Sequence, residues 1–133
     1  MKTKIYIAGQ QGMVGSAILK LVKKKNFKII NCKRGDLNLV DQQQVEKWFK
    51  KHKPDIVINA AGRVGGILDN SKYIDEYIYT NTMIGFNLLN SAHNNGVKKF
   101  INLGSACIYP RNSKQPIKED YLLSSKLEKT NEG

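Results

Sequence analysis

Short apolar runs alternate along the chain with stretches of helical periodicity. Each run is nearly apolar throughout and rich in Ile and Val, which is typical of strands buried on both faces of a parallel sheet. The four predicted strands cover residues 4–8, 27–31, 55–59 and 99–103. Their alternation with helices predicts an α/β fold with a Rossmann-like, doubly wound parallel sheet.

Three helices are predicted between these strands. The first carries apolar residues at helical spacing from Ala17 to Val22 and ends in lysines, which lie at the negative end of its dipole. Asp41 caps the second, which runs to about Lys51. The third spans roughly residues 74–94, and one further helical turn is predicted near residues 121–126. The inner face of the second helix comprises Val45, Trp48 and Phe49.

The predicted sheet has fewer strands than the usual doubly wound fold. In the strand order 3-2-1-4-5-6, strand four pairs with strand one and leaves its other edge unpaired. No linker, repeat or low-complexity tract divides the 133 residues. We therefore expect one Rossmann domain, residues 1–133, that is the N-terminal part of a larger domain truncated after strand four.

Lysine dominates the charge of the chain. Lys and Arg total 22 against 11 Asp and Glu, a net charge of +11, yet the only arginines are Arg34, Arg63 and Arg111. Because arginine is scarce and aromatic residues do not interleave with the lysines, solvated surface lysine explains the charge better than a nucleic-acid site does. A basic nucleic-acid-binding protein is a distant alternative.

The cysteines and the N-terminus bear on the cellular compartment. Cys32 and Cys107 have neither the spacing of a metal site nor that of a disulfide framework. The chain has no apolar run of about 18 residues and no recognisable secretory signal at its N-terminus. We therefore expect a cytoplasmic protein without a metal site and without a membrane or nucleic-acid partner.

Three glycines follow the first predicted strand in the pattern Gly9-x-x-Gly12-x-x-Gly15. The first glycine permits a tight turn, the second lets backbone amides approach a pyrophosphate, and the third lets the helix pack closely on its strand. The N-terminus of the following helix favours negative charge. A strand before the glycines and a helix after them indicate dinucleotide binding.

The end of the second strand bears on which dinucleotide is bound. A carboxylate there accepts hydrogen bonds from the ribose hydroxyls of NAD, whereas a cation pairs with the 2′-phosphate of NADP. The chain has Lys33 and Arg34 at this point, and its first acidic residue is Asp36. These residues favour NADP over NAD, although solvated turn residues would look the same.

The fourth strand is followed by Ser105 and Cys107. Ligands of open α/β sheets bind outside the carboxyl ends of the strands at the topological switch point, which the expected strand order places between strands one and four. A hydroxyl there can hydrogen-bond a substrate carbonyl, and a thiol can exchange a proton with a neighbouring carbon acid. A small buried hydrophobe is the alternative role for such a cysteine.

With these motifs in place, the sequence resembles the extended short-chain dehydrogenase/reductase family and, within it, the GDP-L-fucose synthases. The segments that carry the resemblance are distributed over the whole chain. The most specific are Gly-Ser-x-Cys-Ile-Tyr-Pro and Thr-Asn-Glu, whereas many relatives share the glycine triplet. The matching segments are residues 7–17, 36–39, 64–67, 103–110, 114–116 and 130–132.

The resemblance implies an activity on a nucleotide sugar. The family converts GDP-4-keto-6-deoxy-D-mannose to GDP-L-fucose by epimerising two ring carbons and then reducing the C4 ketone with NADPH. In these roles Ser105 would bind the substrate carbonyl, and Cys107 would act as acid and base in the epimerisation.

The resemblance also assigns the cofactor contacts. Arg34 would bind the 2′-phosphate of NADP(H), and Asn38 and Leu39 would border the adenine. The family often has His-Arg where this chain has Gln10 and Gln11. The nicotinamide side would be lined by Leu103, Gly104 and Ser105. The pyrophosphate would be held by Gly9, Gln10, Gln11, Gly12, Met13, Val14 and Gly15.

One expected element of the family is missing from this sequence. Reduction in the family uses a Tyr-x-x-x-Lys pair, and none of the 6 tyrosines is followed by a lysine at that spacing. We therefore expect the chain to be inactive alone, and to form a homo-oligomer or be completed by a missing C-terminal half. Another NAD(P)-dependent nucleotide-sugar epimerase or dehydratase, and a non-catalytic dinucleotide-binding module, are the alternatives.

Overall fold

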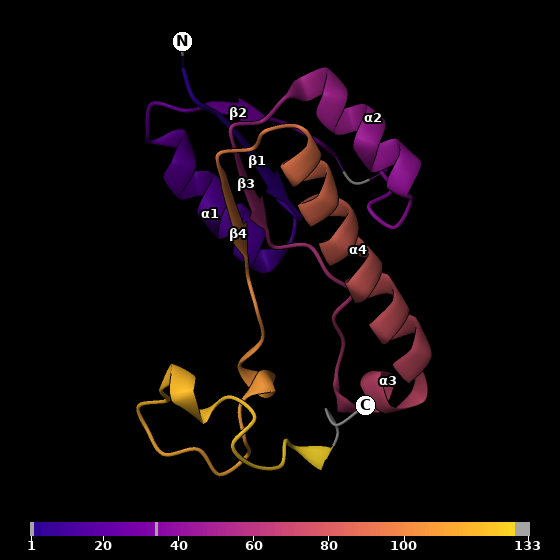
Figure 1. The fold of residues 1–133 in the computed structure, drawn as a ribbon, viewed down its shortest axis with the longest axis vertical. Helices are drawn as coiled ribbons and strands as arrows, with labels where there is room; N and C mark the ends of the chain where they lie inside the picture. Colours follow the sequence, from indigo (N-terminus) through magenta and orange to yellow (C-terminus); the bar gives the residue numbers. More distant parts are fainter. Residues whose placement is uncertain (1, 34, 130–133) are drawn as a thin grey trace. The chain divides into compact units, whose positions relative to one another are not determined.

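The computed structural model describes residues 2–33 and 35–129 (Figure 1). Packing divides the chain into two compact units: a sheet unit of Met1–Arg63 with Glu76–Leu103, and a second unit of Val64–Asp75 with Gly104–Gly133. The elements occur in the order β1 (Lys4–Ala8), α1 (Met13–Lys23), β2 (Lys28–Ile30), α2 (Gln42–His52), β3 (Ile56–Asn59), α3 (Ile67–Lys72), α4 (Ile74–Asn94), β4 (Lys99–Asn102), η1 (Ala106–Ile108) and η2 (Glu119–Tyr121).

The sheet unit contains a parallel sheet in the order β2-β1-β3-β4. Ile5 of β1 is in register with Ile29 of β2 and with Ile56 of β3. Farther along β3, Ile58 is in register with Ile101 of β4. These pairings confirm the predicted Rossmann-like sheet and place the carboxyl ends of its strands along one edge.

The position of the fourth strand differs from the sequence prediction. β4 forms an edge of the sheet as expected, but its partner is β3, and β1 lies between β2 and β3. No strand lies between β2 and α2 in the described part of the chain, so β3 is the next strand, and it pairs with the side of β1 that β2 leaves free. The switch point is therefore between β1 and β3, and not between strands one and four.

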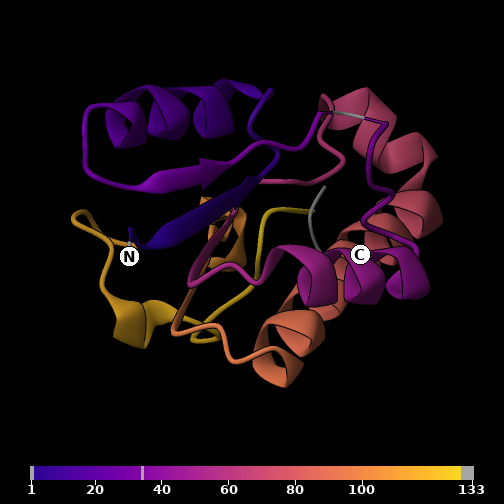
Figure 2. The same cartoon turned by 90° about the horizontal axis from the view of Figure 1, so that it is seen from above.

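Figure 2 shows helices on both faces of this sheet, with α1 on one face and α2 and α4 on the other. Parallel crossovers are right-handed, so the face that a helix covers depends on the direction in which the chain moves across the sheet. The connection from β1 to β2 runs one way, and the connections through α2 and α4 run the other way. The reversal after β2 thus explains the two helical layers.

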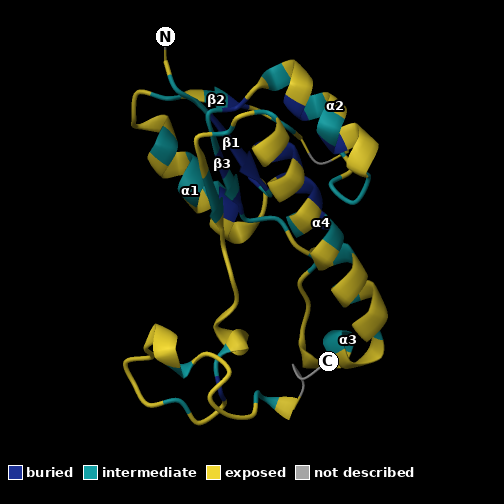
Figure 3. Cartoon of the chain, viewed as in Figure 1, coloured by how far each residue is buried: buried dark blue, intermediate teal, exposed yellow. Residues whose placement is uncertain are grey.

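The hydrophobic core lies between the sheet and the two helices α2 and α4 that cover one of its faces (Figure 3). Side chains alternate between the two faces of a strand, so Tyr6 and Ala8 of β1 point into this core. The predicted inner face of α2 is confirmed, because Val45 and Phe49 are fully buried and Trp48 packs against them. The contribution of α4 comes from Ile84, Leu88 and Ala92.

The face that α1 covers is less completely packed. Ile5 and Ile7 are buried there, whereas Ile56, Ile58 and Ile101 are only half-buried. Ala17 and Leu21 of α1 are exposed although they belong to its apolar pattern. Within residues 2–33 and 35–129, no helix combines the length and apolar composition needed to cross a membrane.

The second unit contains elements that the sequence pattern did not predict. α3 occupies part of the segment before the long helix, and η1 follows Ser105. The helical turn predicted near residues 121–126 is instead η2, which ends at Tyr121. Most residues from 104 to 129 are exposed (Figure 3), so apolar periodicity gives little information about this segment.

Candidate functional site

The turn between β1 and α1 has the geometry of a phosphate-binding loop. Gly9 follows β1 with φ +77°, in the left-handed region that favours glycine. The amide of Gly12 donates to the carbonyl oxygen of Gly9 at 2.9 Å and closes the turn. Gly12 is the N-cap of α1 and has no side chain to occupy the amides of the first turn. Such amides at a helix N-terminus bind anions.

Two of the glycines are required by close backbone packing. A Cβ atom at Gly15 would lie 2.1 Å from the carbonyl oxygen of Gly9. A Cβ atom at Gly9 would lie 2.6 Å from the carbonyl oxygen of Ala60, which follows β3. The turn is therefore pressed against α1 on one side and against the loop after β3 on the other.

Gln10 connects this turn to the end of β2. Its side chain is 8% exposed, and its Nε2 donates to the carbonyl oxygen of Cys32 at 2.6 Å. Its Oε1 is buried without a hydrogen-bond partner among the residues described. Burial, chiefly, raises the pKa of the Cys32 thiol and also that of the neighbouring Tyr6 phenol.

The segment between β2 and α2 contains the residues predicted to bind the adenosine half of a dinucleotide. Lys33 is exposed, and its amide donates to Asp36 Oδ2 at 2.8 Å. Arg34 lies outside the described residues. Asn38 is exposed and Leu39 is half-buried. The carbonyl oxygens of Leu39 and Val40 each accept a hydrogen bond from Nδ2 of Asn87 on α4, both at 2.9 Å.

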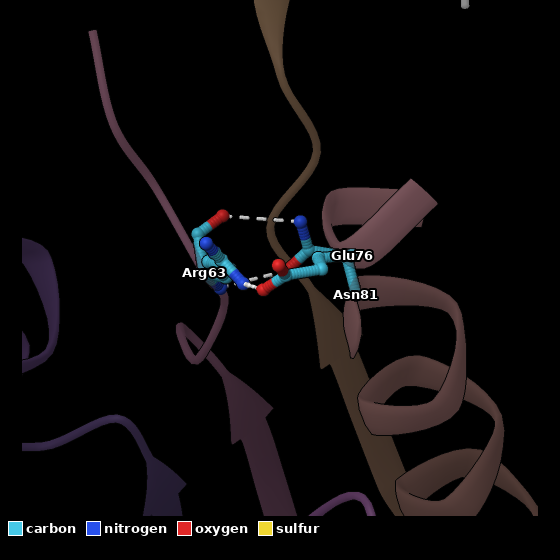
Figure 4. A network of polar contacts seen from close by, with 3 residues as sticks. All are labelled: Arg63, Glu76 and Asn81. Carbon is cyan, nitrogen blue, oxygen red and sulfur yellow. Dashed lines mark hydrogen bonds and ion pairs between the residues drawn. The ribbon is translucent and has the colours of Figure 1, made fainter. Parts of the chain in front are cut away.

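The loop after β3 is held by a second set of side chains. Asn59 is 6% exposed, and its Oδ1 accepts from the amide of Ala61 at 3.1 Å. Its Nδ2 donates to Oδ1 of Asn102 on β4 at 2.8 Å. Asn81 of α4 accepts from the Arg63 amide at 2.7 Å and donates to the Arg63 carbonyl at 3.0 Å (Figure 4).

The side chain of Arg63 is bound to the same helix. Its guanidinium forms an ion pair with Glu76 (Figure 4). The guanidinium also lies over the ring of Tyr77, with Cζ 4.8 Å from the ring centroid. The hydrogen bond that the guanidinium donates to Glu76, above all, raises the pKa of Arg63. Arg63 is thus attached to α4 by both its backbone and its side chain.

The residues that follow β4 were predicted to face the nicotinamide and the substrate. The amide of Leu103 donates to the carbonyl oxygen of Asn59 at 3.1 Å, which extends the pairing of β4 with β3. Gly104, Ser105 and Cys107 are exposed and belong to the second unit. Oγ of Ser105 caps η1 by accepting the amide of Cys107 at 3.1 Å.

The structure thus brings together the glycine turn, the end of β2 and the loop after β3. Sequence reasoning did not predict that Gln10, Asn59, Asn81 and Asn87 would hold these segments in place by side-chain hydrogen bonds. A polar residue at the end of a strand or inside an apolar helix was the only available signal. Within the described part of the chain, His, Cys, Asp and Glu side chains form no group of three that could hold a metal ion.

Comparisons with known proteins agree with this geometry. The family model described as NAD dependent epimerase/dehydratase family matches residues 5–133. A GDP-L-fucose synthase from Sinorhizobium fredii is 43% identical over 129 residues, which are 97% of this chain and 41% of the relative. The GDP-L-fucose synthase of Escherichia coli is 43% identical over 132 residues, which are 98% of this chain and 41% of the relative.

A solved structure gives the same result. A GDP-mannoheptose C4 reductase from Campylobacter jejuni with NADP bound superposes with a TM-score of 0.90 at 38% identity. The match covers 97% of this chain and 38% of the reductase. The chain therefore spans about two fifths of the length of these relatives.

Proposed function

Because the chain belongs to the NAD dependent epimerase/dehydratase family, we propose that it is the NADP-binding part of a nucleotide-sugar epimerase/reductase of the GDP-L-fucose synthase type. The glycine turn carries the proposal. Side chains are sterically excluded at Gly9 and Gly15, and the uncapped amides at the start of α1 suit a pyrophosphate. Residues 1–133 form the NADP-binding Rossmann domain in this proposal.

Two residues of the second unit are assigned to the sugar. We assign Ser105 to the substrate carbonyl, because an Oγ that accepts the Cys107 amide can still donate its own proton. Cys107 is exposed and is assigned to proton transfer during epimerisation. NADPH, when bound, supplies the hydride that reduces the C4 ketone of GDP-4-keto-6-deoxy-D-mannose. We expect no such reduction by these 133 residues alone, because they contain no Tyr-x-x-x-Lys pair.

Cofactor choice is tested most simply by comparing NADPH with NADH. We expect the purified chain to bind NADPH more tightly, because Arg34 offers a cation for the 2′-phosphate. Dissociation constants from nicotinamide fluorescence should show that Arg34→Ala weakens NADPH binding and leaves NADH binding unchanged. Arg111→Ala removes the same charge from the second unit and serves as the matched control. Equal affinities of the unaltered chain for the two cofactors would contradict the NADP assignment.

A second candidate is a reductase that acts on a different GDP-sugar. The similarity to the Campylobacter GDP-mannoheptose C4 reductase favours it, since its TM-score is 0.90 and its identity 38%. Both candidates require the same glycine turn and the same cofactor. Turnover assays with GDP-4-keto-6-deoxy-D-mannose and with a GDP-mannoheptose substrate would distinguish the two candidates. These assays would use the chain together with the C-terminal part of a relative.

A further inference from the structure

Two asparagines of α4 bind the backbone of two different loops. Asn81 forms two hydrogen bonds with the backbone of Arg63, in the loop after β3. Asn87 is 4% exposed and donates to both Leu39 and Val40, in the segment after β2. Neither side chain belongs to the glycine turn, and each spans a long sequence separation, 18 residues for Asn81 and 47 to 48 for Asn87.

The strand order indicates which part of a dinucleotide each loop would meet. The glycine turn at the end of β1 takes the pyrophosphate, and the end of β2 takes the adenosine ribose. Because β2 and β3 lie on opposite sides of β1, the nicotinamide half has to extend over the end of β3. The loop held by Asn81 is therefore on the nicotinamide side, and the segment held by Asn87 is on the adenosine side.

The loop after β3 is close enough to the turn for its position to matter. A Cβ atom at Gly9 would lie 2.6 Å from Ala60 O and 2.8 Å from Ala61 Cα, so the two backbones are in direct contact. Gly62 lets Asn81 approach, because a Cβ there would lie 3.1 Å from Asn81 Oδ1. Asn81 and the buried Asn59 together fix the loop from Ala61 to Arg63.

We propose that Asn81 and Asn87 are positioning residues that hold the two halves of the cofactor site independently, Asn81 the nicotinamide side and Asn87 the adenosine side. The proposal rests on the proposed function, since it assumes that the turn binds NADP(H). It assigns to α4 a role in cofactor affinity although neither asparagine lies in the glycine motif.

The test compares a whole cofactor with its adenosine half. Calorimetric titration of the 133-residue chain with NADPH and with adenosine 2′,5′-bisphosphate gives a dissociation constant for each ligand. We expect Asn81→Ala to raise the dissociation constant of NADPH about tenfold, which corresponds to the loss of a pair of hydrogen bonds. The dissociation constant of the bisphosphate should stay within about twofold of its value for the unaltered chain. Asn87→Ala should raise the dissociation constants of both ligands by similar factors. Asn90→Ala changes an exposed asparagine of the same helix and should alter neither.

The outcomes separate the inference from the proposed function. If Asn81 had a merely structural role, Asn81→Ala would weaken the binding of both ligands equally. That result would overturn the inference, and so would an unchanged affinity for NADPH. If Asn87→Ala does not fold, the comparison of Asn81→Ala with Asn90→Ala alone decides whether the inference holds. If the unaltered chain binds neither ligand, the proposed function is wrong and the inference is wrong with it.

Discussion

Gly9 and Gly15 are the residues on which the candidate site depends most directly. The two contact each other through backbone atoms, and a Cβ at Gly15 would lie 2.1 Å from Gly9 O. No rotamer change can relieve such a contact, because both partners are main chain. The glycine spacing in the sequence was therefore a reliable signal, since the requirement for glycine is local and steric.

We expect Gly15→Ala to lower the free energy of unfolding by about 1–3 kcal/mol, the usual cost of overpacking. Gly85→Ala is the matched control, because no described atom other than those of its chain neighbours and the backbone of α4 lies within 4 Å of a Cβ at that position. It should raise the free energy of unfolding by about 0.5–1 kcal/mol, since alanine is preferred to glycine inside a helix. Urea unfolding followed by circular dichroism measures both. Equal effects of the two substitutions would contradict this account of the turn.

The side-chain hydrogen bonds that hold the site together could not be predicted, because they join residues that are distant in sequence. Gln10 reaches a carbonyl 22 residues away, and Asn59 reaches a side chain 43 residues away. Such contacts depend on which strands become neighbours. A glutamine in a turn or an asparagine at a strand end has no distinguishing pattern in a single sequence.

At the scale of elements, α2 shows what local sequence determines. Asp41 was predicted as its cap, and its Oδ1 accepts the Gln44 amide at 3.0 Å while its Oδ2 accepts from the Gln44 side chain at 2.8 Å. The bond from the Gln44 amide contributes most to lowering the pKa of Asp41. The carboxylate is therefore favoured in the folded state.

We expect Asp41→Ala to lower the thermal midpoint, whereas Asp41→Ser, which keeps a capping oxygen, should lower it less. Because the folded pKa of Asp41 is lowered, its contribution is fully present above the unfolded value, about pH 4, and is lost as the pH falls through the folded pKa. The difference between the unaltered chain and Asp41→Ala should therefore shrink on acidification. Thermal melts across this range measure it, and a pH-independent difference would contradict the charged cap.

Strand order was the main error at this scale. The four strands were predicted within a residue at each end, because apolar runs are local. The neighbour of β4 was not predicted correctly, because pairing depends on the direction in which the chain crosses the sheet, which apolar runs do not reveal. α3 is short and has no buried residue, so its sequence lacks the periodicity that made α4 predictable.

At the scale of the whole molecule, the open edge of β4 leads us to expect association. Among the described residues no strand pairs with the outer side of β4, and Ile101 of this strand is only half-buried beside Ile58. We expect sedimentation coefficients that increase with protein concentration. Ile101→Lys should reduce this dependence, because a charge on an edge strand opposes pairing with another chain. A concentration-independent monomer of the unaltered chain would count against it.

Calorimetric titration of Gly12→Asp with NADPH tests the central claim most directly. Gly12 has φ −73° and ψ 171° at the N-cap of α1, a geometry that aspartate favours, and its added Cβ would lie 3.3 Å from Gly9 O, which a small shift relieves. The variant should keep its cooperative thermal transition and lose NADPH binding, because its carboxylate would repel a pyrophosphate at the same amides. Binding of NADPH by Gly12→Asp with unchanged affinity would show that the glycine turn does not hold the cofactor.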